Sequence, residues 1–248
     1  MAYEEMQATP LSAIAEAFEY LADTIEDGKD ELHLIAFCDA CALVSVLFNS
    51  LGLAFKFAEL EYCAKVRGLV EASKIYPTLH NVLDVDVQNG SVKCPGSLSR
   101  NLRRVRQGLD LIRALFEQFL TTYDCSLREA ASSAYRQTCA PYHSWAVRAA
   151  AAAGMYALPS RDQLLTSLKE TDESAEFRMK RYIKAVVPVI QYIDKLYLSR
   201  NIKLDWLQGA LLFIVLSSLE SWPPAKPHWD DRVKGGWGYS NGEPSIGL

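Results

Sequence analysis

The chain has 248 residues, of which 50% are hydrophobic and 23% charged; this balance excludes a disordered chain and indicates a folded protein with a sizeable core. Its length permits one helical domain followed by a tail. The formal net charge of −4 excludes a general positive field that would draw the whole surface to nucleic acid or anionic lipid, so any anion site must be local.

The first third of the chain has a clear helical pattern. Apolar residues recur at helical spacing over 10–26, which predicts an amphipathic helix. The stretch 32–51 is apolar almost all round, as expected of a helix buried between neighbours, and a third helix is predicted from 54 to 76, ended by Pro77. The segment 78–95 mixes Asn, Asp and Gly with apolar residues and has the least clear pattern of the chain, so the sequence assigns it no definite element.

The middle of the chain continues with the same period. A long helix is predicted over 97–123, with an apolar face along its length. Further helices are predicted at 127–139, 144–157, 160–169 and 171–200. Ser160-x-x-Gln163 is a capping-box pattern, and Thr171 precedes two acidic residues, as at a helix start. No stretch alternates with period two, so the expected fold class is all-α with about eight helices.

The sequence changes character after Trp206. The apolar run 207–219 is interrupted by polar residues and is shorter than the ~20 residues that a membrane-spanning helix needs. Proline, glycine and tryptophan follow without a helical period. The sequence therefore predicts a helical domain over 10–206 and an irregular tail over 207–248, with no membrane span.

The amino terminus and the cysteines indicate the cellular compartment in which the protein is expected. The amino terminus carries Glu4 and Glu5 and has no apolar run after a basic start, so we expect no secretory signal and a cytoplasmic location. In a reducing compartment the six cysteines are expected to be buried thiols. They are Cys38, Cys41, Cys63, Cys94, Cys125 and Cys139. The lone Cys38-x-x-Cys41 pair lies in no βαβ pattern and is interpreted as core packing.

The start of the helix predicted over 97–123 is the most informative feature for function. It carries Arg100, Arg103, Arg104 and Arg106 within about two turns. Because a helix amino terminus is already partly positive, added cations are unfavourable there unless an anion is bound. Arg100 and Arg104 are four residues apart, so their guanidinium groups share a face and could grip one phosphate. The alternative is a solvated basic face.

Two weaker signals accompany these arginines. Glu61 and Lys65 are four residues apart on one predicted helix face, which alone is most often a surface ion pair contributing at most ~1 kcal/mol. His143, in the run Tyr142-His143-Ser144-Trp145, is by itself most often a structural histidine or a helix-start residue. Neither feature assigns a function alone.

Taken together, these segments resemble the glycolipid transfer protein family over roughly residues 11–206. The resemblance rests on the Glu61/Lys65 and Arg100/Arg104 pairs, the run from His143 to Trp145, and the motif 154–159, Gly-Met-Tyr-Ala-Leu-Pro. It is closest to the plant accelerated-cell-death branch, which transfers ceramide-1-phosphate. The resemblance implies a two-layer, all-α sandwich that opens to admit lipid chains.

The resemblance also implies roles for particular residues. Glu61 would accept hydrogen bonds from the ceramide amide and hydroxyl, and His143 would bind the ceramide carbonyl. The headgroup phosphate would be held by Lys65, Arg100 and Arg104. Trp145 would lie on the surface that meets the membrane.

Two positions bear on which lipid is bound and how tightly. The sugar-binding branch has a tryptophan where this chain has Arg104, and a guanidinium suits a phosphate better than a sugar face. The family residue matching Glu61 is normally aspartate, and the extra methylene moves the carboxylate by about 1.5 Å. Hydrogen bonds tolerate little misplacement, so the helix or the lipid must shift, or the affinity falls.

The expected function is non-enzymatic transfer of a phosphorylated sphingolipid, with ceramide-1-phosphate as the expected ligand and transient contact with a membrane surface. No catalytic or metal site is expected, because the four histidines are far apart and no Gly-x-Ser-x-Gly or His-Glu-x-x-His motif occurs. No cofactor or nucleic-acid partner is expected either. The alternative hypothesis is a lipid sensor or protein-interaction module that regulates cell death through the same sphingolipid pocket. The sequence does not separate the two, because both bind the lipid.

Overall fold

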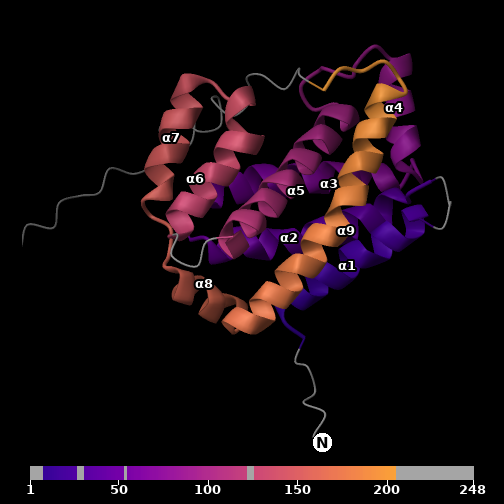
Figure 1. Ribbon diagram of the computed structural model, residues 1–248. Coiled ribbons are helices and arrows are strands. Elements are labelled where there is room, and N and C mark those ends of the chain that lie inside the picture. Colours follow the sequence, from indigo (N-terminus) through magenta and orange to yellow (C-terminus); the bar gives the residue numbers. More distant parts are fainter. Residues whose placement is uncertain (1–7, 27–30, 53–54, 122–125, 205–248) are drawn as a thin grey trace, which may run out of the picture.

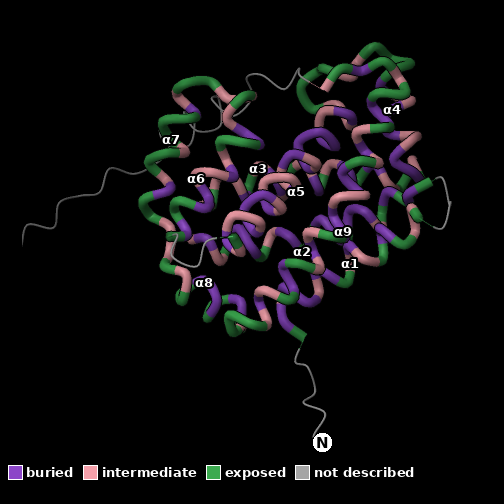
Figure 2. Tube along the Cα trace, viewed as in Figure 1, coloured by how far each residue is buried: buried purple, intermediate pink, exposed green. Residues whose placement is uncertain are grey.

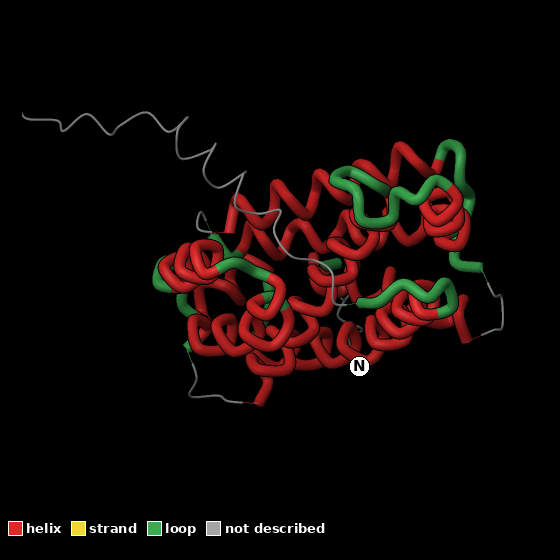
Figure 3. Tube along the Cα trace, turned by 90° about the horizontal axis from the view of Figure 1, so that it is seen from above, coloured by secondary structure: helices red, strands yellow, loops and turns green. Residues whose placement is uncertain are grey.

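The computed structural model describes residues 8–26, 31–52, 55–121 and 126–204. Within these ranges the chain forms nine α-helices and the short 3-10 helix η2, joined by short loops (Figures 1 and 3). The helices are α1 (Pro10–Glu26), α2 (Leu34–Ser50), α3 (Lys56–Ser73), α4 (Leu79–Gln88), α5 (Leu98–Thr121), α6 (Leu127–Thr138), η2 (Ala140–Tyr142), α7 (Trp145–Met155), α8 (Arg161–Leu168) and α9 (Asp172–Leu198).

The helices are arranged in two layers. One layer contains α1, α2 and α3, which lie behind α9, α5 and α6 in Figure 1. Helix α1 packs against α9 and α3 packs against α5, so both edges of the sandwich are joined. The expected all-α, two-layer sandwich is confirmed. No helix in the described part of the chain is both long and apolar enough to cross a membrane.

The apolar stripes of the helices face one shared core. Buried positions follow the inward sides of the helices and exposed positions follow their outer turns (Figure 2). Helix α5 contributes the face expected from its sequence, including Val105, Leu109, Ile112 and Phe116. The Ser160/Gln163 capping box is present at α8, and the Thr171 side chain accepts from the Ser174 backbone at the start of α9. Local sequence and tertiary packing therefore agree at these helix starts.

Helix α4 was not expected from the pattern of 78–95. It begins with a capping box between Thr78 and Asn81, and it buries Leu79, Val82 and Leu83. Only ten residues long, it presents a short apolar stripe, and polar residues interrupt its period, among them Asn81 of the cap and the buried Asp86. The Thr78-x-x-Asn81 spacing was the signal that could have revealed it.

The expectation that α2 is buried on all sides is wrong. Its inward face is buried, but Ile35, Leu43 and Val46 on the outer side are 47%, 37% and 39% exposed. Helix α2 lies in one layer of the two-layer sandwich, so in the described part of the chain α1 and α3 flank it, its inner side faces α5, and its outer side is exposed. A uniformly apolar sequence therefore does not show which side of a helix is covered.

The cysteines are mostly as expected. Cys38, Cys41 and Cys139 are buried, Cys63 is half-buried, and burial raises the pKa of the Cys38 thiol to about 12. The expectation is wrong for Cys94, which is exposed in the loop before α5. Cys125 and the tail predicted over 207–248 lie outside the described residues.

Helices α3 and α5 approach closely at Gly108. A Cβ atom added there would lie 2.7 Å from the Tyr62 ring, which is buried and whose hydroxyl donates to the Cys41 carbonyl. We expect Gly108→Ala to lower the free energy of unfolding by ~1–3 kcal/mol, because a fixed aromatic ring must move. Chemical denaturation measures this difference.

Gly68→Ala is the matched control for this substitution. It makes the same change on the facing helix, but its nearest obstacle is the amide end of Asn101, a more adaptable side chain. The control should lose less stability than Gly108→Ala. Equal stability of Gly108→Ala and the parent would contradict the close packing inferred between α3 and α5.

Candidate functional site

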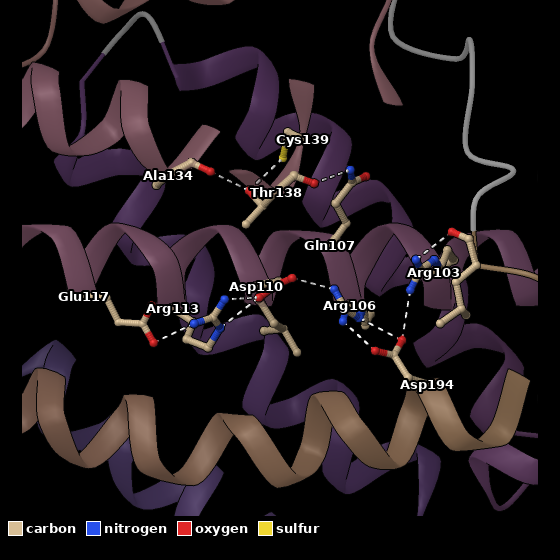
Figure 4. Close-up of polar contacts among 12 residues, drawn as sticks. Arg103, Arg106, Gln107, Asp110, Arg113, Glu117, Ala134, Thr138, Cys139 and Asp194 are labelled. Atoms are coloured by element: carbon tan, nitrogen blue, oxygen red, sulfur yellow. Dashed lines mark hydrogen bonds and ion pairs between the residues drawn. The ribbon is translucent and has the colours of Figure 1, made fainter. Parts of the chain in front are cut away.

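The four arginines at the start of α5 divide into two sets. Arg103 and Arg106 face α9, where both contact Asp194 at 3.0 Å (Figure 4). Arg106 also donates to Asp110 at 2.6 Å, and Arg103 donates to the Leu204 carbonyl at 2.8 Å. These two arginines are held by structural partners, and their burial excludes a solvated basic face.

Arg104 and Arg100 form the second set, on another side of α5. Arg104 is 8% exposed, and it donates to the Gln107 side chain at 3.3 Å. Gln107 in turn donates to the Thr138 carbonyl at the end of α6, at 3.2 Å. Burial, and then the charge of Arg100, lowers the pKa of Arg104. The Arg100 guanidinium donates to the Lys93 carbonyl at 3.0 Å.

Glu61 and Lys65 face this second set from α3. Their side chains form an ion pair at 3.4 Å and are 11% and 24% exposed, so this is not the surface pair that spacing alone would suggest. The charge of Glu61 raises the pKa of Arg104, opposing the effect of burial. Within the described part of the chain, Glu61 Oε1 is buried and accepts no hydrogen bond. A carboxylate in that state is suited to accept from a bound molecule.

His143 completes the group from the segment between η2 and α7. Its Nδ1 atom lies 2.8 Å from the hydroxyl of Tyr135 on α6. Burial, and then the positive charge of Arg104, lowers the pKa of His143 to about 4. The imidazole is therefore neutral near pH 7, and it lies within electrostatic reach of Arg104.

The expected site residues therefore gather from three parts of the fold. Helix α3 supplies Glu61 and Lys65, α5 supplies Arg100 and Arg104, and the α6–α7 connection supplies His143. With a neutral imidazole, these five residues carry three cations against one carboxylate. That surplus of positive charge favours a phosphate or another multiply charged anion.

Trp145 follows His143 closely along the chain. It is the first residue of α7, two positions after His143, and it is 77% exposed. The preceding Ser144 caps the helix, which fixes the direction in which the chain leaves His143. An indole this exposed on a folded surface is suited to contact an apolar partner or a bilayer interface.

Two polar residues beside the site were not expected from the sequence. Gln107 shares a helix face with Arg104 because it lies three residues later, a spacing that could have revealed it. Tyr135 lies eight residues before His143 and meets it only because η2 turns the chain back toward α6. No local spacing signals that second contact.

The chain is similar in sequence to known proteins. The glycolipid transfer protein (GLTP) family matches residues 32–170. The ACD11 homolog protein of Arabidopsis thaliana is 65% identical over 204 residues, which cover 80% of this chain and 89% of that protein. The ceramide-1-phosphate transfer protein of Mus musculus is 27% identical over 169 residues, or 62% of this chain and 78% of that protein.

A solved structure gives the same answer for the fold. A mutant of Arabidopsis ACD11 (accelerated-cell-death 11), complexed with C12 ceramide-1-phosphate, has a TM-score of 0.79 and 44% identity, and it covers 81% of this chain and 100% of that one. The likeness to the plant accelerated-cell-death branch is confirmed. With the family matching more than half of its residues and a relative at 65% identity, the chain belongs to the glycolipid transfer protein family.

Proposed function

We propose that this protein binds a phosphorylated sphingolipid, ceramide-1-phosphate, and carries it between membranes without chemical change. The observation that carries the proposal is the local surplus of cations at Lys65, Arg100 and Arg104 in a chain whose formal net charge is −4. The relatives named for ceramide-1-phosphate, and the ACD11 structure that contains it, support the choice of lipid.

Each site residue has a role in this proposal. Lys65, Arg100 and Arg104 hold the headgroup phosphate through charge-assisted hydrogen bonds. Glu61 accepts from the ceramide amide and hydroxyl, and neutral His143 donates to the acyl carbonyl. The cations select the phosphate, whereas Glu61 and His143 recognise the ceramide linkage, so a phosphate alone satisfies only part of the site.

Transfer also requires shelter for the hydrocarbon chains. Removing a methylene group from apolar surroundings into water costs ~0.8 kcal/mol, so two long chains leave a bilayer only into a comparably dry space. We propose that the helical domain, residues 10–206, supplies this space by separating its layers. The protein would act in the cytoplasm, with transient contact to membranes and no cofactor or catalytic step.

A vesicle assay with mass balance tests the proposal. Donor vesicles carry labelled ceramide-1-phosphate, and the label is followed in acceptor vesicles and in extracted lipid. The proposal predicts intact lipid in the acceptor vesicles at a rate proportional to protein concentration. Stable binding with no transfer would favour the hypothesis of a lipid sensor. Chemical modification of the labelled lipid would contradict a non-enzymatic carrier.

The Glu61 carboxylate provides a residue-level prediction. Glu61→Gln should weaken ceramide-1-phosphate binding by ~1–3 kcal/mol, because a charged acceptor becomes neutral with almost no change of shape. Glu61→Asp should preserve or improve binding, since it restores the shorter side chain of the family. Lipid competition at one ionic strength measures both variants.

The first substitution tests whether the Glu61 carboxylate binds the lipid, and the second tests whether its side-chain length suits the pocket. A Gln variant that binds as well as the parent would remove Glu61 from the site. A weaker Asp variant would show that this pocket has adapted to the longer side chain.

Trp145 is proposed to contact the membrane during docking. We expect Trp145→Ala to slow transfer roughly fivefold by weakening vesicle partitioning, because an indole gains from the bilayer interface. The matched control is Tyr20→Ala, which removes another exposed aromatic ring, 65% exposed, from α1 and thus away from α7 (Figure 1). If vesicle sedimentation shows equal partitioning for Trp145→Ala and the parent, the docking role is wrong.

A further inference from the structure

We propose that Tyr135 is a positioning residue that donates its hydroxyl proton to His143 Nδ1 and thereby holds the imidazole in the tautomer whose Nε2–H faces the lipid carbonyl. This inference rests on the proposed function for its consequence, the strength of lipid binding. Its structural part, the tautomer of His143, concerns the protein without lipid.

The contact is direct and joins two separate elements. Tyr135 lies near the end of α6, whereas His143 follows η2, and the hydroxyl oxygen is 2.8 Å from Nδ1. The two rings lie with centroids 5.6 Å apart and planes inclined at 42°. Tyr135 is half-buried, so the contact is partly shielded from water, which would otherwise compete for the imidazole nitrogen.

The backbone already fixes where His143 sits. The His143 N–H donates to the Ala140 carbonyl, and Ser144 caps α7 immediately afterwards. Pro141 lies within η2 and restricts that turn further. These contacts leave the imidazole free to rotate about its side-chain bonds, so a side-chain partner is needed to orient the ring.

Only one assignment of the proton suits a carbonyl ligand. A neutral imidazole has one N–H and one lone pair, and a carbonyl oxygen only accepts. If Tyr135 donates to Nδ1, the proton lies on Nε2 and can be donated to the lipid. If Nδ1–H donates to Tyr135 instead, Nε2 presents a lone pair and meets the carbonyl as a second acceptor.

The surroundings keep both groups in the required protonation state. Burial raises the pKa of Tyr135, so its hydroxyl keeps its proton, and burial together with Arg104 lowers the pKa of His143 to about 4. A phenol hydroxyl facing a neutral imidazole is the stronger donor of the two. Burial and the neighbouring cation therefore keep the histidine neutral, and Tyr135 decides which nitrogen carries the proton.

Tyr135→Phe tests this role, because it removes the hydroxyl and keeps the ring that packs on His143. Long-range ¹H–¹⁵N correlation of the lipid-free protein distinguishes the two tautomers, and His143→Gln identifies the signals of this residue. We expect the Nε2–H tautomer in the parent with a hydrogen-bonded Nδ1, and loss of that bond in Tyr135→Phe. Affinity for ceramide-1-phosphate should fall roughly tenfold, the effect of one lost hydrogen bond.

Two further variants separate positioning from packing. Tyr142→Phe makes the same chemical change one residue from His143 and should leave both readouts at parent values. Adding Tyr135→Phe to His143→Gln should cause no further loss of affinity, because the tyrosine acts through the histidine.

The inference is overturned by an Nδ1–H tautomer in the parent, by unchanged affinity in Tyr135→Phe, or by a full additional loss in the double variant. If the parent binds no ceramide-1-phosphate, the proposed function fails. The tautomer measurement, which uses no lipid, then still decides how Tyr135 and His143 interact.

Discussion

Arg104→Ala is expected to abolish measurable transfer of ceramide-1-phosphate while the protein stays folded. The guanidinium is buried beside the charges of Arg100 and Glu61, so its contacts with a phosphate would be shielded from water. Losing charge-assisted hydrogen bonds of ~1.5–3 kcal/mol each weakens binding about 10- to 100-fold or more. Arg100→Ala should show the same defect, because the two guanidinium groups share the site.

The control for a general loss of charge is Arg136→Ala on α6, which removes an exposed arginine. It should transfer lipid at the parent rate. Transfer rate and far-ultraviolet circular dichroism are measured on all three variants. Unchanged transfer in both Arg100→Ala and Arg104→Ala would remove the phosphate from this site.

Asp194→Ala is expected to cause the largest loss of stability. Asp194 on α9 contacts Arg103 and Arg106 on α5, and all three side chains are at most 20% exposed. Removing one partner from a largely buried ion pair leaves its charges uncompensated, which typically costs ~3–5 kcal/mol. Arg103 would lose its carboxylate partner here and Arg106 would keep only Asp110, so we expect a loss of about 3 kcal/mol in the free energy of unfolding.

Asp23→Ala is the matched control, because it removes an exposed aspartate from α1. Its unfolding free energy should lie within ~0.5 kcal/mol of the parent. Urea denaturation followed by circular dichroism compares the three proteins. A loss for Asp194→Ala no greater than for the control would mean that the network in Figure 4 adds little to the packing of α5 on α9.

The sequence predicts the layout of the helices because period and caps are local properties. The apolar face of α5 and the starts of α8 and α9 are visible in short windows of residues. Helix α4 is missed because ten residues give too few turns to establish a period. The exposed side of α2 is missed for a different reason. When a helix is apolar all round, its sequence does not show which sides other helices cover.

The contacts of the candidate site also fall into two kinds, those visible as local spacing in the sequence and those that depend on distant residues. Pairs four residues apart, Glu61 with Lys65 and Arg100 with Arg104, are visible in the sequence and lie near one another in the fold. The division of the four arginines is not visible, because it depends on Asp194, which is 91 residues from Arg103. The contact of Tyr135 with His143 likewise depends on a turn at η2 rather than on helical spacing.

A comparison of headgroups tests the central claim most directly. Ceramide-1-phosphate, ceramide and glucosylceramide with identical chains are offered in donor vesicles, and transfer to acceptor vesicles is measured at one ionic strength. Only the headgroup differs, so the cations at Lys65, Arg100 and Arg104 should decide the outcome. The proposed function predicts rapid transfer of ceramide-1-phosphate and little of the other two, whereas equal transfer of glucosylceramide would contradict it.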